Sequence, residues 1–388
     1  MKAVKIKEDI YWVGALDWSI RNFHGYITNR GATYNAYLIL DEKVTLIDTV
    51  KSTFSEEMIE RISDIIDPSK IDYIIANHVE MDHSGAIPVM KKLCPNASII
   101  TSGPSGVKGL SAHYGAYDYQ AVKGGDTLNI GKRTLSFITT PMLHWPDNML
   151  TYCPEEKILF SNDAFGQHYT STSRFDEDNH LDVVMEEARK YYANILMCYG
   201  KQAQTAWKAV NELELEMIVP SHGVIWKDHI NEILEAYKKW SDNDPESGAI
   251  VVYDSMWHST EVMAKTIAEA YASNGVPAKL YDLKENHSSN IIPELLDSKY
   301  IAVGSPTLNS QMMPTVAAFL CYIKGLSPKN RKAFAFGSYG WGGQSIKQVE
   351  EELIQCGFTI SMEGIRIPYI PTKDQLKEVE DKVAASID

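Results

Sequence analysis

The chain has 388 residues, which is too long for one ordinary hydrophobic core, so two domains are expected. Apolar residues make up 44% and charged residues 23% of the sequence, as is usual for a globular protein in water. The formal net charge of −14 argues against a nucleic-acid partner. No apolar run approaches the roughly 20 residues that span a bilayer, so no membrane partner is expected.

The cysteines and the first residues of the chain indicate the cellular compartment in which the protein is expected. The five cysteines are scattered and form no CxxC pair, which argues against a disulfide framework and a cysteine-based zinc or rubredoxin site. The first residues lack the apolar stretch of a signal peptide. We therefore expect a cytoplasmic protein.

The first half of the chain, from about residue 10 to residue 223, has the pattern of short strands interleaved with a few helices. Runs rich in β-branched and aromatic residues predict strands, and apolar residues every three or four positions predict helices. The expected strands include 32–40, 44–50, 71–78, 134–142, 158–165 and 217–223, and the expected helices are 55–66, 181–196, 227–240 and one after Ser84. This order suggests two sheets faced by helices, a layered α/β sandwich.

A polar segment with Pro and Gly, SDNDPESG at 241–248, is the best linker candidate. After it, strands and helices alternate strictly, with strands expected at 249–254, 277–283, 299–306, 332–340 and 359–367. Five such strands indicate a doubly wound parallel sheet, which binds ligands at the carboxyl ends of its strands. The expected domains are residues 1–245 and 249–388.

The strongest local signal is His78-Val-Glu80-Met-Asp82-His83, directly after an apolar strand. Side chains alternate along a strand, so His78 and Glu80 are expected on the same side. Asp82 and His83, in the turn that follows, can reach back to a second ion. Four such side chains suit a core poorly, because each would need its own buried partner.

Three more candidate ligands lie just past strands: His144, Asp163 and His222. The total is four imidazoles and three carboxylates, enough for two metal ions with one bridging carboxylate. A single histidine of this kind is more often structural or exposed than a ligand. The clustered motif with three strand-end partners reverses that preference.

The order HxExDH, then His, Asp and His, resembles the metallo-β-lactamase fold, whose hydrolases usually carry HxHxDH. Here Glu80 replaces the second histidine of that motif, and a carboxylate in place of an imidazole disfavours zinc and favours iron. This replacement is the mark of the flavodiiron proteins. The chain resembles that family along its whole length, through NRGATYNAYLI, NHVEMDHSG, PMLHWPD, NDAFGQH, KYYANIL and PSHG.

The resemblance implies an N-terminal αββα metallo-β-lactamase-like sandwich and a C-terminal flavodoxin-like domain with a five-stranded parallel sheet. It implies a non-haem diiron centre with one iron on His78, Glu80 and His144, the other on Asp82, His83 and His222, and Asp163 as the bridge. In some family members the imidazole equivalent to His83 turns away from the metal, so its role stays open. Tyr191, His168 and His24 resemble groups that hydrogen-bond to bound gas, although packing or a backbone hydrogen bond is an equal alternative for these three.

Three loops at successive strand ends of the second domain indicate an FMN site. The first runs directly into a helix, whose free N–H groups and dipole suit a phosphate. The GxxxxGK and GxGxxG patterns are absent, which argues against a Walker loop and a dinucleotide turn. A flavodoxin-like domain without a cofactor is the weaker alternative. The expected FMN contacts are Ser255, Met256, Trp257, His258, Ser259, Thr260, Ser305, Pro306, Thr307, Leu308, Asn309, Ser338, Tyr339, Gly340, Trp341, Gly342 and Gly343.

The family resemblance implies an oxidoreductase that reduces dioxygen to water, nitric oxide to nitrous oxide, or both. FMN would pass the electrons to the diiron site. No rubredoxin module is recognisable, so the expected electron donor is an external rubredoxin-like protein or a reduced deazaflavin coenzyme. The resemblance also implies a head-to-tail homodimer or a dimer of dimers.

Two other functions fit parts of the sequence. One is a zinc hydrolase of the metallo-β-lactamase fold with a flavodoxin-like appendage, against which Glu80 and Asp163 argue. The other is an electron carrier whose first domain is an inert docking platform, against which the full set of seven ligands argues.

Overall fold

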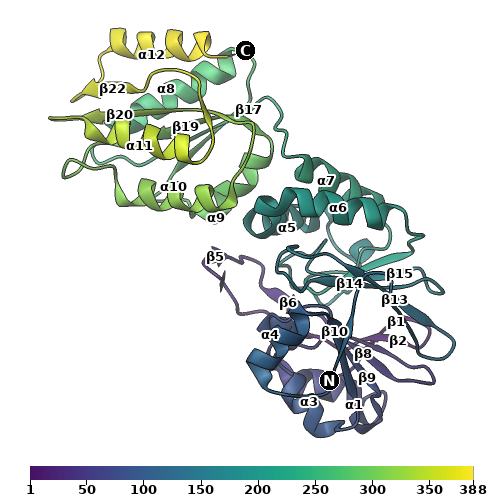
Figure 1. Ribbon diagram of the computed structural model, residues 1–388. Coiled ribbons are helices and arrows are strands. Elements are labelled where there is room, and N and C mark those ends of the chain that lie inside the picture. The colour runs from purple at the N-terminus through teal and green to yellow at the C-terminus, as the bar shows by residue number, and fades with distance from the viewer. Residues whose placement is uncertain (388) are drawn as a thin grey trace. The chain divides into compact units, whose positions relative to one another are not determined.

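The computed structural model describes residues 1–387 and divides them into two compact units (Figure 1). The first unit comprises Met1–Tyr191 and Lys201–Ser241. The second comprises Tyr192–Gly200 and the chain from Asp242 onward. The short segment at 192–200, which includes a π-helical stretch, thus groups with the second unit. The domain limits 1–245 and 249–388 stay a prediction.

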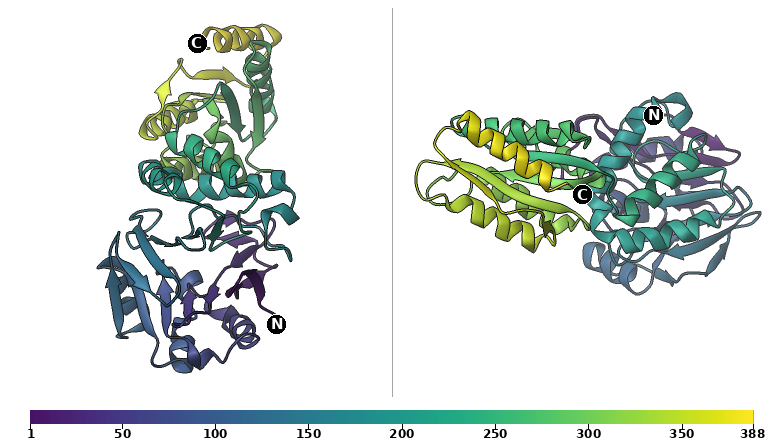
Figure 2. Two further views of the ribbon diagram at one scale, coloured as in Figure 1. Left: turned by 90° about the vertical axis from the view of Figure 1, so that its right-hand side faces the viewer. Right: turned by 90° about the horizontal axis from the view of Figure 1, so that it is seen from above.

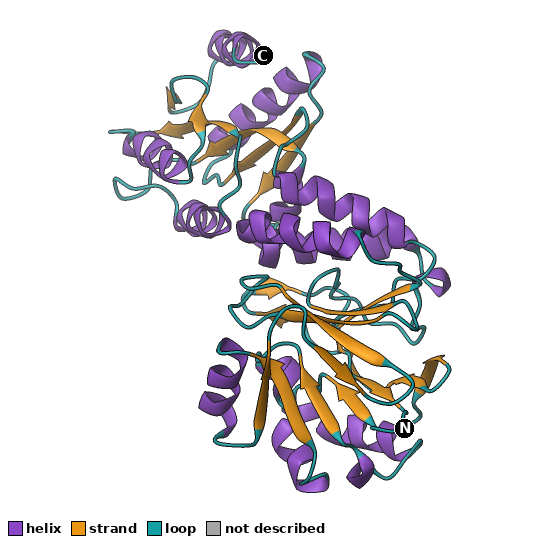
Figure 3. Ribbon diagram, turned by 45° about the vertical axis from the view of Figure 1, so that its right-hand side comes forward, coloured by secondary structure: helices purple, strands orange, loops and turns teal. Residues whose placement is uncertain are grey.

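The strands of the first unit form two stacked sheets and two small two-stranded sheets (Figure 3). The first sheet contains β1 (Val4–Lys7), β2 (Ile10–Trp12), β7 (Tyr37–Ile39), β8 (Thr45–Ile47), β9 (Tyr73–Ala76), β10 (Ser98–Ser102) and β11 (Tyr119–Val122), in that order. The second contains β12 (Thr127–Asn129), β13 (Thr134–Thr139), β14 (Met149–Cys153), β15 (Ile158–Asn162) and β16 (Met217–Pro220). The two small sheets pair β3 (Ala15–Asp17) with β6 (Ala32–Tyr34) and β4 (Asn22–Phe23) with β5 (Tyr26–Ile27).

Alternation along the strands of the first sheet fills two separate cores. Ile74 packs with the helices on the outer face, whereas its neighbour Ile75 packs between the two sheets. Leu46 and Ile47 divide in the same way. A period of two with both faces buried is what a central layer requires.

Helices cover the outer faces of both sheets of the first unit. Apolar residues of α1, α3 and α4 join the outer core of the first sheet, and α5, α6 and α7 lie over the second (Figure 3). The helices are α1 (Ser55–Ser63), α2 (Met81–Ser84), α3 (Ile87–Leu93), α4 (Ser105–Tyr114), α5 (Leu181–Tyr191), α6 (Gly200–Asn211) and α7 (Ile230–Asp242). This is the predicted αββα sandwich.

The strand predicted at 32–40 is divided into β6 and β7, which belong to different sheets. The division falls at Asn35, whose backbone N–H donates to Ser221 and whose side-chain amide donates to the carbonyl oxygens of Pro220 and Gly223. These bonds take the chain out of regular pairing at this residue, a contact that local sequence does not reveal.

The second unit is a parallel sheet in the order β18-β17-β19-β20-β21, with β22 also on β20. Its strands are β17 (Gly248–Tyr253), β18 (Ala278–Asp282), β19 (Ser298–Gly304), β20 (Lys332–Tyr339), β21 (Thr359–Ile360) and β22 (Ile365–Pro368). Its helices are α8 (Ser259–Ser273), α9 (Ser288–Ile291), α10 (Pro314–Leu326), α11 (Gln344–Gln355) and α12 (Lys373–Ala385). The fifth strand, predicted as one run at 359–367, is interrupted between β21 and β22.

Helices α8 and α12 lie on one face of this sheet and α10 and α11 on the other (Figure 2, right). On the first face, Met263 and Ile267 of α8 and Val379 of α12 pack on the strands. The doubly wound, flavodoxin-like architecture was predicted, and its ligand edge is the carboxyl end of the strands. Within residues 1–387, no helix has both the length and the apolar character needed to cross a membrane.

Candidate metal centre and flavin pocket

All seven predicted metal ligands converge in the first unit. Strand β9 ends at Ala76, so His78 and Glu80 lie in the loop before α2. The sequence pattern instead predicts them as a continuation of the strand. The first turn of α2 carries Asp82 and His83. The other three ligands follow β13, β15 and β16, and they are His144, Asp163 and His222.

One group of side chains consists of His78, Glu80 and His144. The Nε2 atoms of His78 and His144 each lie 3.3 Å from Glu80 Oε2. The same two nitrogens lie 3.7 and 3.4 Å from Asp163 Oδ2. Four ligand atoms from three loops thus surround one point, as a metal site requires.

The second group consists of Asp82, His83 and His222. His83 Nε2 and His222 Nε2 lie 3.4 and 3.2 Å from Asp82 Oδ2. They lie 3.0 and 3.5 Å from Asp163 Oδ1. Asp163 therefore turns one oxygen to each group, and the His83 imidazole faces the cluster.

Several atoms of this cluster are buried and have no hydrogen-bond partner among residues 1–387. They are both carboxylate oxygens of Asp82, both ring nitrogens of His83 and Asp163 Oδ2. Buried polar atoms are almost always paired, because an unpaired one costs about 1–3 kcal/mol or more. Cations bound between the two groups would satisfy the orphaned atoms that face the cluster, so the side chains present fit a two-metal centre.

The carboxylates make the cluster strongly favourable for positive charge. Burial opposes protonation of His78, but bonds to Asp147 and Glu80 outweigh it and raise the pKa of this imidazole to about 10. Burial likewise opposes protonation of His83, and nearby Asp82 and Asp163 raise its pKa to about 9. The same field that stabilises these protons stabilises metal cations.

The three predicted neighbours of the centre all touch it or its ligands. The Tyr191 hydroxyl donates to Asp163 Oδ1 at 3.0 Å. His24 Nε2 lies 2.7 Å from Glu80 Oε1. His168 packs edge-on against His222 and bonds to the hydroxyl of Tyr26.

A buried polar network holds the strand ends that carry the ligands. Asp48 accepts hydrogen bonds from the Asn77 backbone N–H at 2.8 Å and from the Asn162 side chain at 3.3 Å. Asn77 directly precedes His78, and Asn162 directly precedes Asp163. One carboxylate thereby fixes the two loops relative to each other, which limits how far their ligands can move.

A cavity of about 740 Å³ lies at the carboxyl edge of the sheet in the second unit. All three predicted loops contribute to it. The predicted lining residues are Met256, Trp257, Ser259, Pro306, Thr307, Leu308, Asn309, Ser338, Tyr339, Gly340 and Trp341. Ser310, Tyr369 and Ile370 also line it and were not predicted.

Six predicted contacts do not line this cavity: Ser255, His258, Thr260, Ser305, Gly342 and Gly343. Thr260 is buried and bonds to Ser338 Oγ at 3.0 Å, tying the first loop to the third. The His258 side chain instead bonds to Glu261 at 2.7 Å. Gly342 and Gly343 have φ of 86° and 69°, so glycine lets the loop turn left-handed before α11.

The first loop fits a phosphate group. Ser255 Oγ is buried and has no hydrogen-bond partner in the described part of the chain. Helix α8 begins at Ser259 with the free N–H groups of its first turn. Lys284 Nζ donates to the Ser255 carbonyl at 2.6 Å and adds positive charge beside the loop. An orphaned hydroxyl next to a helix start matches the phosphate end of FMN.

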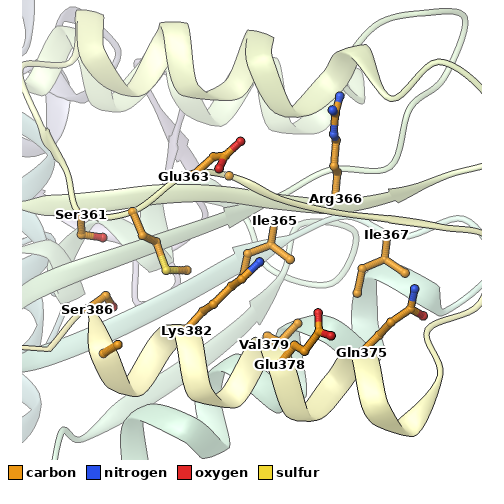
Figure 4. Close-up of a pocket in the computed structure, with 13 residues that line it drawn as sticks. Ser361, Glu363, Ile365, Arg366, Ile367, Gln375, Glu378, Val379, Lys382 and Ser386 are labelled. Atoms are coloured by element: carbon orange, nitrogen blue, oxygen red, sulfur yellow. The ribbon is translucent and has the colours of Figure 1, made fainter.

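A second cavity in this unit, of about 490 Å³, lies between β22 and α12 (Figure 4). Lys382, Glu378 and Gln375 point from α12 towards the strand, while Glu363 and Arg366 lie on its other side. The cavity shares no lining residue with the flavin pocket. No motif in the sequence predicted it.

Comparisons with known proteins agree with the two architectures. The family model described as ODP family beta lactamase matches residues 32–223, and the model described as Flavodoxin matches residues 251–382. The nitric oxide reductase of Moorella thermoacetica is 43% identical, over 99% of this chain and 98% of that protein. The coenzyme F420H(2) oxidase of Methanothermobacter marburgensis is 41% identical, over 99% and 98%.

Two solved structures superpose on nearly the whole chain. The rubredoxin oxygen:oxidoreductase of Desulfovibrio gigas has a TM-score of 0.96 at 40% identity, covering 100% of this chain and 98% of that one. The flavodiiron protein of Giardia intestinalis has a TM-score of 0.96 at 36% identity, covering 99% and 96%. This chain belongs to the flavodiiron protein family. The predicted family, fold class and cofactors, FMN and a non-haem diiron centre, are confirmed.

Two features of this flavodiiron protein escaped the sequence analysis although a signal was present. Tyr369 and Ile370 follow β22, so they occupy the same strand-end position as the three predicted loops. Asp147 belongs to the PMLHWPD motif but was not singled out, and its carboxylate bonds to His78. In both cases the residue type alone gave no signal. The position of the residue, after a strand or within a motif, was the signal that the sequence contained.

Proposed function

We propose that this flavodiiron protein reduces dioxygen to water, nitric oxide to nitrous oxide, or both, with electrons passing through FMN to a diiron site. The observation that carries the proposal is the Asp163 carboxylate, which presents one oxygen to each of two ligand groups. A carboxylate shared in this way suits a pair of metal ions better than a single one. It lies in a chain that also has a flavodoxin domain.

The proposed ligands follow the two groups. Each iron receives two imidazoles, one carboxylate of its own and one oxygen of the shared Asp163. His78, Glu80 and His144 hold the first iron, and Asp82, His83 and His222 hold the second. Support comes from the 4.8 Å limit within which all ligand atoms of each group lie.

Bound FMN and iron supply the electron storage and transfer, and the protein supplies position and protons. Taking dioxygen to two waters consumes four electrons and four protons. Tyr191 would hold Asp163 through a donated hydrogen bond. Burial and the nearby carboxylate raise the pKa of Tyr191 well above the usual value, so its hydroxyl keeps the proton that this bond needs. His168 stays neutral, because burial, with His222 adding to it, lowers its pKa.

The electron donor is proposed to be a rubredoxin-like protein or a reduced deazaflavin coenzyme. The names of two relatives, the rubredoxin-oxygen oxidoreductase and the coenzyme F420H(2) oxidase, contain these donors. The rim of the flavin pocket supports docking by apolar contact. Trp257, Trp341 and Ile370 are 87%, 85% and 80% exposed, and none of the residues lining the pocket is charged.

The same exposed rim supports a head-to-tail homodimer or a dimer of dimers, in which the flavin of one subunit faces the irons of its partner. Electron transfer falls steeply with distance, so such an arrangement would bring the two cofactors together. A cytoplasmic location is proposed as well, on the scattered free cysteines.

The first experiment measures metal and flavin in protein purified without oxygen, followed by gas consumption after chemical reduction. About two irons and one FMN per chain are expected, with uptake of dioxygen or nitric oxide and little peroxide. The relative rates with the two gases would rank them. Zinc without iron, together with no gas uptake, would contradict the proposal and favour the hydrolase alternative.

A further inference from the structure

Asp147 is a buried carboxylate that contacts the metal centre through a ligand. Its Oδ2 accepts a hydrogen bond from His78 Nδ1 at 2.9 Å and another from the backbone N–H of Val79 at 2.7 Å. The residue is 3% exposed. A carboxylate on the outer nitrogen of an imidazole leaves the other nitrogen unprotonated for metal and makes it a stronger electron donor.

The other three imidazoles of the centre have no such partner in the part of the chain that the structure describes. His222 Nδ1 bonds to the backbone carbonyl of Thr33 at 2.6 Å. His83 Nδ1 is buried and has no hydrogen-bond partner. His144 approaches the nearby carboxylates only through the nitrogen that faces the cluster. Among the four imidazoles, within the described residues, His78 is therefore the one whose outer nitrogen is hydrogen-bonded to a carboxylate.

The loop that carries Asp147 also carries a ligand. His144 lies three residues earlier, and the backbone carbonyl of Asp147 accepts from Ser102 Oγ at 2.5 Å. Asn148 closes the loop by accepting from the Trp145 backbone N–H at 2.6 Å. A single fixed loop thus supplies one ligand of the first iron and orients another.

We propose that Asp147 is a positioning residue that makes the iron on His78, Glu80 and His144 the one of lower reduction potential. The inference rests on the proposed diiron ligands. Those ligands are of the same types for both irons, so any difference between the irons must come from outside them. Asp147 supplies negative charge to the first iron, which favours its ferric state.

Two other hydrogen bonds affect the difference between the reduction potentials of the two irons. Tyr191 donates to Asp163 Oδ1, the oxygen that faces the second iron, and so withdraws electron density on that side. His24 bonds to Glu80 and acts in the opposite direction, but its side chain is 68% exposed, so water screens it. The buried hydrogen bonds of Asp147 and Tyr191 therefore both lower the reduction potential of the first iron relative to the second.

The test is Asp147→Asn in the intact protein, because the amide oxygen can accept both hydrogen bonds while the charge is removed. We expect one iron to become about tenfold easier to reduce, a rise of about 59 mV for a one-electron couple. The second iron should move much less, so the two potentials draw closer together. Redox titration followed by EPR and Mössbauer spectroscopy measures both irons separately.

A matched control is Asp176→Asn. Asp176 is fully buried and accepts backbone N–H groups of residues 227–229, without touching a proposed ligand. This variant should leave both potentials unchanged at full iron content. Loss of iron to a chelator should be about tenfold faster for Asp147→Asn than for this control.

Ser102→Ala gives a second measurement if Asp147→Asn fails to fold. It keeps the charge but releases the loop, so a smaller shift confined to the same iron is expected. Unchanged potentials in the folded variant, equal shifts of both irons, or a wider separation would overturn the inference. Wild-type protein with two irons and gas uptake would then leave the proposed function intact, whereas wild-type protein without two irons would overturn both.

Discussion

The metal centre and the flavin pocket differ most in exposure and charge. The proposed metal ligands are buried except for His144, whose side chain is 14% exposed, and four imidazoles face three carboxylates. The flavin pocket is lined by neutral side chains, and two of its tryptophans are among the most exposed in the described chain. A small cation is held by charge in a dry, fixed site, whereas a planar cofactor is held by loops and must stay open to its electron donor.

From this comparison we expect that loss of the shared ligand weakens iron binding at both ligand groups. Asp163→Ala removes the oxygens shared by the two ligand groups, so iron should fall from about two to below about one per chain, while FMN is retained. Iron and flavin analysis of the purified variant measures this. Ser161→Ala is the control, because that buried hydroxyl donates to the Ala164 backbone carbonyl. Full iron occupancy in Asp163→Ala would contradict the shared role.

Removal of a single hydrogen bond at the metal centre should slow the reaction without emptying the site. Tyr191→Phe deletes the donor to Asp163 and should lower gas turnover about tenfold to a hundredfold at unchanged iron content. Steady-state uptake measured with a gas electrode tests this. Tyr37→Phe removes an equally buried hydroxyl, which donates to the Pro220 carbonyl, and should leave turnover nearly unchanged.

The flavin pocket should respond more gently to loss of a contact. Trp341→Ala removes an exposed aromatic ring from the rim and should weaken FMN binding about five- to tenfold, with iron unaffected. Titration of flavin-free protein by fluorescence gives the dissociation constant. Trp18→Ala, an exposed tryptophan of the first unit, is the control. A loss of iron in Trp341→Ala would contradict the independence of the two sites.

The smallest expected effect concerns salt. Because the pocket lining carries no charge, the rate of reduction by the donor should change less than about twofold between about 0.05 M and about 0.5 M NaCl. Stopped-flow measurement of flavin reduction tests this. A tenfold fall with salt would show that charges outside the rim steer the donor.

The residues predicted from sequence lie together in the fold where chemistry and spacing coincide. The HxExDH motif placed four ligands close together in the chain, so their convergence needed only a local turn. The three flavin loops were found because parallel strands end at one sheet edge. The interruption at Asn35 and the contribution of Tyr369 depend on partners far away in sequence, which no local pattern encodes.

The sequence by itself determined the two architectures, because periodicity and residue chemistry are local properties. It also predicted the seven side chains that converge in the first unit and the three loops that line the cavity of the second. Only the tertiary structure decided that Asp163 turns one oxygen to each ligand group and that Asp147 stands behind His78 and none of the other imidazoles. Those relations depend on how separate loops are held together by buried hydrogen bonds. Such bonds form between residues tens of positions apart, so they exist only once the chain has folded.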